Sequence, residues 1–88
     1  MTLEEAKAAL ASTDGSIISL QVTIRDLAKC VADCELSLAG LTPGDSRRFA
    51  IEAQRGLEQR RLEKRQALLK QLVQARTRIQ ESIEKMER

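Results

Sequence analysis

The chain has 88 residues and a formal net charge of +2, and its only aromatic residue is Phe49. So short a chain forms one domain at most and leaves no room for a catalytic cleft between domains. Ala, Leu, Glu, Gln, Lys and Arg dominate the composition, which is typical of long helices rather than of sheets. We therefore expect an all-α protein with a single domain over residues 1–88.

The sequence predicts neither a secretory signal nor a membrane span. Met1-Thr2-Leu3-Glu4-Glu5 is acidic and lacks the apolar core of a signal peptide. The longest stretch without a charge runs from Gly15 to Ile24, about half of what a membrane-spanning helix needs. We expect a soluble, cytoplasmic protein.

A heptad repeat occupies the first 41 residues. One set of residues recurs every seven positions, a second set follows it by three, and eleven of the twelve positions are apolar. The positions are Leu3, Ala6, Leu10, Thr13, Ile17, Leu20, Ile24, Leu27, Val31, Cys34, Leu38 and Leu41. Over more than five heptads, this pattern predicts a long helix with a coiled-coil seam.

Local signals delimit this first helix. Thr2 followed three residues later by Glu5 is a capping box, which places the helix start at residue 3. Gly40 followed by the apolar Leu41 has the arrangement of a left-handed glycine cap, which ends the helix at residue 39.

A break at residues 14–16 is the alternative to a continuous first helix. Asp14-Gly15-Ser16 is a turn signal when taken locally. The heptad keeps its phase across these residues, so we favour a continuous helix over residues 3–39, with an internal glycine that costs about 1 kcal/mol.

A second helix is predicted over residues 43–88, after a turn at residues 40–42. Thr42 is a candidate cap, Pro43 suits the first helical position, and the only later glycine is Gly56. Residues 1–41 contain three basic and six acidic side chains, and residues 42–88 contain twelve and seven. This asymmetry favours pairing of the two helices in an antiparallel, coiled-coil-like hairpin.

The apolar pattern of the second helix is less regular. Its last half has a seam that Leu68 and Val73 support and Arg76 interrupts. The seam consists of Leu62, Leu69, Leu72, Ile79, Ile83 and Met86. The first half has apolar residues in a different phase, namely Phe49, Ala50, Ala53 and Leu57.

A basic patch separates these two phases. We define the basic patch as Arg55, Arg60, Arg61, Lys64 and Arg65. Like charges one turn apart repel, which suggests an acidic partner, although a solvated face is also an ordinary role for such residues. With a turn near Leu41, the patch would face Ile17 to Leu27 and leave that apolar stretch poorly covered.

The first helix has a second apolar stripe, about 150° around the helix from the seam. The stripe consists of Ala8, Ala11, Gly15, Ile18, Val22, Ala32, Leu36 and Ala39. One partner helix cannot cover both sides, so we expect a dimeric four-helix bundle or a higher oligomer. The residues expected to carry self-association are Ile17, Ile18, Leu20, Val22, Ile24 and Leu27. The alternative is that the alanines are good helix formers on a solvated face.

Cys30 and Cys34 are one helical turn apart. One chain has no other Cys and no His, so it cannot complete a tetrahedral zinc site, although two copies could together offer four thiolates. We favour two small, buried, reduced cysteines.

These patterns indicate a protein-interaction module rather than an enzyme. No phosphate-binding loop, activated nucleophile, acid pair, cofactor site or metal site can be assembled from the sequence. We expect a small self-associating helical protein that acts on another protein as an adaptor, chaperone or inhibitor, of the kind found among bacterial and phage accessory factors. The alternative is a dimeric nucleic-acid-binding hairpin that uses the basic patch.

Overall fold

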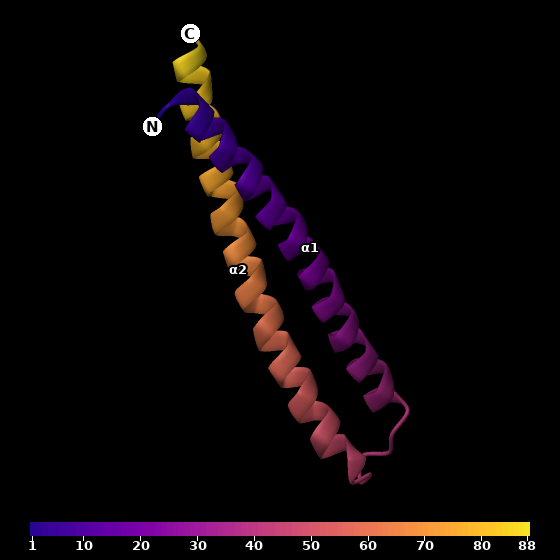
Figure 1. The fold of residues 1–88 in the computed structure, drawn as a ribbon. Coiled ribbons are helices and arrows are strands. Elements are labelled where there is room, and N and C mark those ends of the chain that lie inside the picture. The colour runs from indigo at the N-terminus through magenta and orange to yellow at the C-terminus, as the bar shows by residue number, and fades with distance from the viewer. The chain divides into compact units, whose positions relative to one another are not determined.

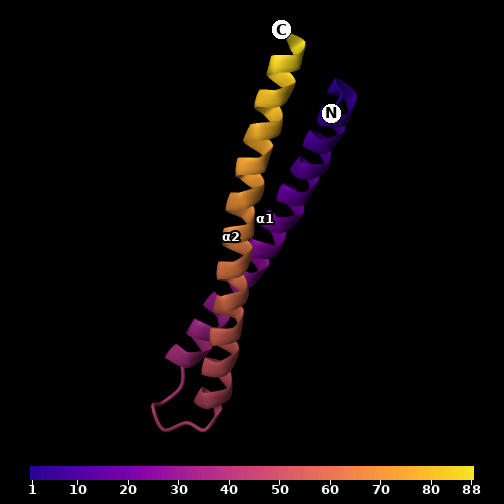
Figure 2. The ribbon, with the colours of Figure 1, turned by 90° about the vertical axis from the view of Figure 1, so that its left-hand side faces the viewer.

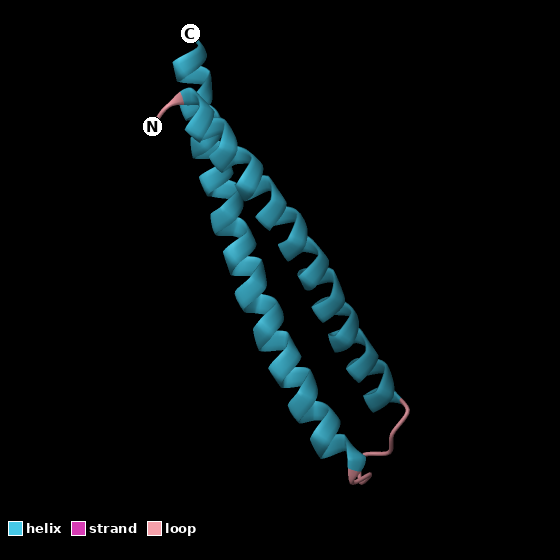
Figure 3. Cartoon of the chain, viewed as in Figure 1, coloured by secondary structure: helices cyan, strands magenta, loops and turns pink.

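The computed structural model describes all 88 residues and contains two helices and no strand (Figures 1 and 3). Helix α1 spans Leu3–Ala39 and helix α2 spans Arg47–Glu87. The all-α prediction is confirmed. The chain divides into two compact units. Unit 1 comprises residues 1–22 and 67–88, and unit 2 comprises residues 23–66. Each unit pairs a segment of α1 with an antiparallel segment of α2 (Figure 2).

The start of α1 is fixed by the predicted capping box. The Thr2 hydroxyl accepts a hydrogen bond from the Glu5 backbone N–H at 3.1 Å and donates one to the Glu5 carboxylate at 3.1 Å. The Ala6 N–H donates to the Thr2 carbonyl at 2.9 Å. These bonds satisfy backbone groups that the first helical turn otherwise leaves without partners.

Helix α1 continues through residues 14–16 without a break. The Thr13 hydroxyl donates to the Ala9 carbonyl at 2.8 Å, one turn earlier in the same helix. The Asp14 carboxylate accepts a hydrogen bond from Arg76 of α2 and forms an ion pair with it. Because Asp14 is engaged across unit 1, its side chain is not available to stabilise a local turn.

The end of α1 differs from the predicted left-handed glycine cap. Gly40 has a negative φ, as has every residue of the chain. The Leu41 N–H instead donates to the Leu38 carbonyl at 3.1 Å. The Arg48 guanidinium, from the first turn of α2, donates to the carbonyls of Leu38 at 3.0 Å and Leu41 at 3.2 Å. A distant arginine therefore satisfies terminal carbonyls that a left-handed glycine cap would otherwise cover.

Replacing Gly40 by alanine is expected to raise the free energy of unfolding by about 0.4–1 kcal/mol, because the unfolded chain loses conformational freedom. A Cβ at this position would meet only the carbonyl oxygens of Ser37 at 3.7 Å and Leu36 at 3.9 Å, which are ordinary contacts. Urea denaturation of the two proteins measures the difference. A decrease of about 1 kcal/mol or more would indicate the left-handed conformation instead.

The connection is longer than predicted, and α2 begins at Arg47 rather than at residue 43. Pro43 and Gly44 occupy a turn that the hydrogen bond from the Asp45 N–H to the Thr42 carbonyl closes at 3.1 Å. The carboxylate of Asp45, rather than the Thr42 hydroxyl, caps α2 by accepting the Arg47 N–H at 2.9 Å. Hydrogen bonds from the Arg47 side chain and backbone lower the pKa of Asp45.

Substitution of Arg48 by methionine is expected to lower the free energy of unfolding by about 1–2 kcal/mol, because two half-buried carbonyls lose a charged donor. Methionine retains most of the aliphatic stem. The matched control is Glu52→Gln, which removes the ion pair of Arg48 with Glu52 but leaves both carbonyl bonds in place. That control should change stability by less than about 0.5 kcal/mol. Equal effects of the two variants in urea denaturation would show that the carbonyl contacts contribute nothing.

The helix register within each unit follows from ion pairs between α1 and α2. In unit 2, Arg55 pairs with Glu35 at 3.4 Å. In unit 1, Lys7 pairs with Glu87 at 3.4 Å. The prediction that the basic patch faces Ile17 to Leu27 therefore holds only where Lys64 and Arg65 run beside the Ile24 to Leu27 end of that stretch, because it assumed a shorter connection. The α2 residues from Arg55 to Gln66 run beside α1 residues from Glu35 back towards Ile24.

The buried side chains lie along the heptad seam of α1. The core of unit 1 contains Ala6, Ile17, Leu20 and Ile83, and the core of unit 2 contains Val31, Cys34 and Leu62. Every α1 residue in these cores is a seam position. In contrast, Leu68 and Val73 of α2 are exposed and do not support the seam as predicted.

Candidate functional site

The six residues predicted to carry self-association divide between two sides of α1. Ile17 and Leu20 are buried within unit 1, and Ile24 and Leu27 are half-buried. These four are seam residues that the chain's own fold covers. Only Ile18 and Val22 are exposed, by 62% and 44%. Of the six, only Ile18 and Val22 therefore belong to the second apolar stripe, whose later members Ala32, Leu36 and Ala39 are also exposed.

In unit 1, the exposed side of α1 forms a regular stripe that we call the α1 outer face. Successive members are alternately four and three residues apart, and every member is exposed. The α1 outer face consists of Glu4, Ala8, Ala11, Gly15, Ile18 and Val22. The small residues at its centre would allow a second helix to approach closely. A Cβ placed on Gly15 meets no atom within 4 Å, so the chain's own packing does not require a glycine there.

In unit 2, the exposed side of α2 forms a second stripe that we call the α2 outer face. It combines apolar and basic residues, all exposed, and its two large apolar side chains, Phe49 and Leu57, are 83% and 45% exposed. The α2 outer face consists of Phe49, Ala50, Ala53, Leu57, Arg60 and Lys64. The different phase of the apolar members was apparent from the sequence. Their position on the side away from α1, and their continuation on the same side of the helix into Arg60 and Lys64, were not predicted.

The basic patch does not form one surface. Arg55 pairs with Glu35, and Arg61 pairs with Glu58 at 3.4 Å, so these two charges have acidic neighbours within the chain. The Arg60 guanidinium donates to the Gly56 carbonyl at 3.3 Å but forms no ion pair.

Lys64 and Arg65 form no ion pair within the chain either. At 100° per residue, Arg60 and Lys64 lie along one side of α2, and Arg61 and Arg65 along a neighbouring side. An acidic partner could therefore use either pair without the other.

Comparison with protein-family models, with characterised proteins and with solved structures gave no match to this chain. The exposed surfaces of the two helices are therefore the features that point to a function.

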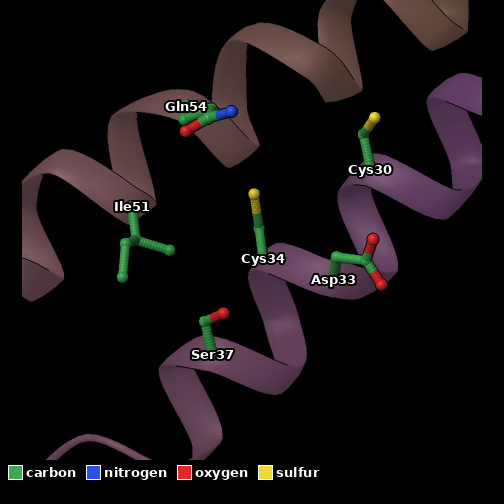
Figure 4. A pocket seen from close by; sticks show the side chains of 6 residues that line it. All are labelled: Cys30, Asp33, Cys34, Ser37, Ile51 and Gln54. Carbon is green, nitrogen blue, oxygen red and sulfur yellow. The ribbon is translucent and has the colours of Figure 1, made fainter.

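Both cysteines line a shallow depression of about 230 Å³ in unit 2 (Figure 4). Cys34 is buried, as expected, but Cys30 is exposed, because it lies beside the seam rather than on it. The other lining residues are Asp33, Ser37, Ile51 and Gln54. None of them is a His, Lys or Arg side chain. No three metal-ligating side chains gather anywhere in the structure, and neither helix has an apolar segment that could cross a membrane.

Proposed function

We propose that the protein is a self-associating helical interaction module that forms a dimeric four-helix bundle or a higher oligomer. The observation that carries this proposal is the outward position of large apolar side chains on both helices. Ile18, Leu36 and Phe49 are 62%, 72% and 83% exposed. They gain little from the fold of a single chain.

Hydrophobic burial supplies the driving force for this association. Transferring a large apolar side chain from water into a contact contributes about 1.5–3 kcal/mol. Exposed single apolar residues are common, but Ile18 and Val22 lie one turn apart on the α1 outer face, and Phe49 and Leu57 share the α2 outer face, which the partner helix does not cover. A second helix docked on such a face would bury several of them at once.

The same proposal assigns the protein a role on the surface of another protein, as an adaptor, chaperone or inhibitor in the cytoplasm. The basic patch supports an acidic partner, because the exposed Arg65, which lies outside the α2 outer face, has no acidic neighbour within ion-pair distance. Binding, rather than catalysis, suits helix faces that expose large apolar side chains to solvent. Charged side chains at the edge of such a contact act mainly on the rate of association and on specificity.

Reversal of Arg61 and Arg65 to glutamate tests the assignment of the basic patch. Both side chains are exposed and lie outside the α2 outer face, so helicity and oligomer size should remain as in the unchanged protein. Capture of an acidic partner from the native host, followed by mass spectrometry, should weaken by about tenfold or more. The matched control reverses Arg78 and Lys85, which are also exposed and without ion pairs. Equal capture by both variants would show that the basic patch does not bind the partner.

A dimeric nucleic-acid binder is the second candidate, and the same unpaired basic side chains favour it. Phosphate contacts release counterions, so affinity for a duplex RNA probe would fall linearly with the logarithm of the salt concentration. An apolar protein contact does not show such a slope. We expect weak RNA binding that the Arg61 and Arg65 reversal and its control change equally. Tight, steeply salt-dependent binding that only the former abolishes would replace the protein-partner proposal.

A further inference from the structure

The two outer faces have matching spacing. On the α1 outer face, Glu4 is followed by residues alternately four and three positions later, up to Val22. On the α2 outer face, read backwards from Lys64, the steps to Arg60, Leu57, Ala53 and Ala50 are also alternately four and three. Two helices with such spacing can pack against each other in antiparallel orientation and keep their stripes in contact over several turns.

One antiparallel register places opposite charges together. It places Glu4 opposite Lys64, at one end of the two faces. Arg60 then lies opposite Ala8, one helical turn from the Glu4 carboxylate. Glu4 and Lys64 are both exposed and form no ion pair within their own chain. The contact would therefore supply each charge with the partner that it lacks.

The same register matches side-chain sizes over the middle of the two faces. Leu57 lies opposite Ala11, and Ile18 lies opposite Ala50, so these two large apolar side chains each meet a small one. Between these pairs, Gly15 lies opposite Ala53, where two small residues permit the closest approach of the backbones. The glycine costs α1 about 1 kcal/mol of helix propensity relative to alanine. The fold of the single chain does not account for this cost, because a Cβ on Gly15 would have no neighbour within 4 Å. Phe49, next to Ala50, would cover the apolar end.

We propose that the α1 outer face of one copy packs antiparallel on the α2 outer face of a second copy, with Glu4 beside Lys64. This inference rests on the proposed self-association and names its two surfaces. Each surface lies within one unit of the chain, the first in unit 1 and the second in unit 2. Because the two faces differ, the contact is heterologous, and every assembly that does not close into a ring retains one free face of each kind.

A charge exchange between copies tests this contact. The variants Glu4→Lys and Lys64→Glu are each measured alone by sedimentation equilibrium, and then as an equimolar mixture. Each variant alone brings like charges together, so its association should weaken by about fivefold to tenfold. In the mixture, the altered α1 face of one variant again meets an opposite charge on the altered α2 face of the other. The unaltered faces also match, so the mixture should associate as the unchanged protein does.

The controls are Glu84→Lys and Lys85→Glu, which make the same charge changes at exposed positions outside both faces. They should associate as the unchanged protein does, alone and mixed. Circular dichroism establishes that all four variants are helical. Weakening by Glu4→Lys but not by Lys64→Glu, or a mixture as weak as the separate variants, would overturn this contact while self-association stands. An unchanged protein that remains a single chain would overturn the proposed self-association and this contact together.

Discussion

Replacing Leu62 by alanine is expected to lower the free energy of unfolding by about 2–3 kcal/mol, the range for a large-to-small change at a buried site. Leu62 is 8% exposed and is the only α2 side chain in the core of unit 2. The truncation would leave a cavity between the α1 and α2 segments of unit 2 or force these segments to shift. Urea denaturation at low protein concentration, where self-association does not contribute, measures the change.

Phe49→Ala is the matched control, because it truncates an exposed side chain of α2 instead of a buried one. Phe49 is the larger side chain, yet it is 83% exposed, so its truncation should change the stability of the dilute protein by less than about 0.5 kcal/mol. At high concentration, the same variant should associate more weakly, because Phe49 belongs to the α2 outer face. A larger loss of stability for Phe49→Ala than for Leu62→Ala in dilute protein would mean that the helix phase described for unit 2 is wrong.

Joint replacement of Ile18 and Val22 by glutamate is expected to weaken self-association by about a hundredfold or more, because two carboxylates would enter an apolar contact. The two side chains face away from the core of unit 1. In dilute protein, the free energy of unfolding should therefore change by less than about 1 kcal/mol. Sedimentation equilibrium and urea denaturation measure the two quantities separately.

The matched control adds two glutamates at the exposed positions Gln21 and Ala28, which belong to neither outer face. It changes the net charge of the chain by the same amount and should associate as the unchanged protein does. If the Ile18 and Val22 variant keeps its oligomer size, the α1 outer face is solvated. If it unfolds at high dilution, the stripe packs within the chain instead.

Helix α1 was predictable because several independent signals agree there. The heptad, the capping box at Thr2 and the glycine after Ala39 all indicate one amphipathic helix, and its seam residues form the core. The conformation of Gly40 was not predictable from local sequence. It depends on Arg48, which reaches the last carbonyls of α1 from the next helix.

Helix α2 was harder to predict because two apolar patterns compete within it. Phe49 and Leu57 suggest one side of α2 as the side that packs against α1, whereas Ile51 and Leu62 suggest another. Hydrophobicity alone does not decide between these two sides. The longer connection decided the register, because Asp45 competes with Thr42 as the cap and Pro43 takes part in a turn. Four residues of additional connection moved every expected contact between the helices.

Of the two candidate surfaces, the one on α1 was likewise easier to predict than the one on α2. The outer stripe of α1 was predicted from sequence, because its spacing is regular and distinct from the seam. The α2 outer face was not, because its apolar and basic parts were interpreted as separate features. That their common side faces away from α1 becomes evident only when the helix phase is fixed by Leu62 and by the ion pair of Arg55 with Glu35.

Sedimentation equilibrium of the unchanged protein tests the central claim, self-association through exposed helix faces, most directly. Over a range from about 1 to about 300 µM, which spans the affinities of ordinary protein contacts, the weight-average mass should rise above the 9.8 kDa of one chain. The rise should persist at high salt, because the contact is largely apolar. A mass that remains at 9.8 kDa over the whole range, in a protein that circular dichroism shows to be fully helical, would contradict the claim.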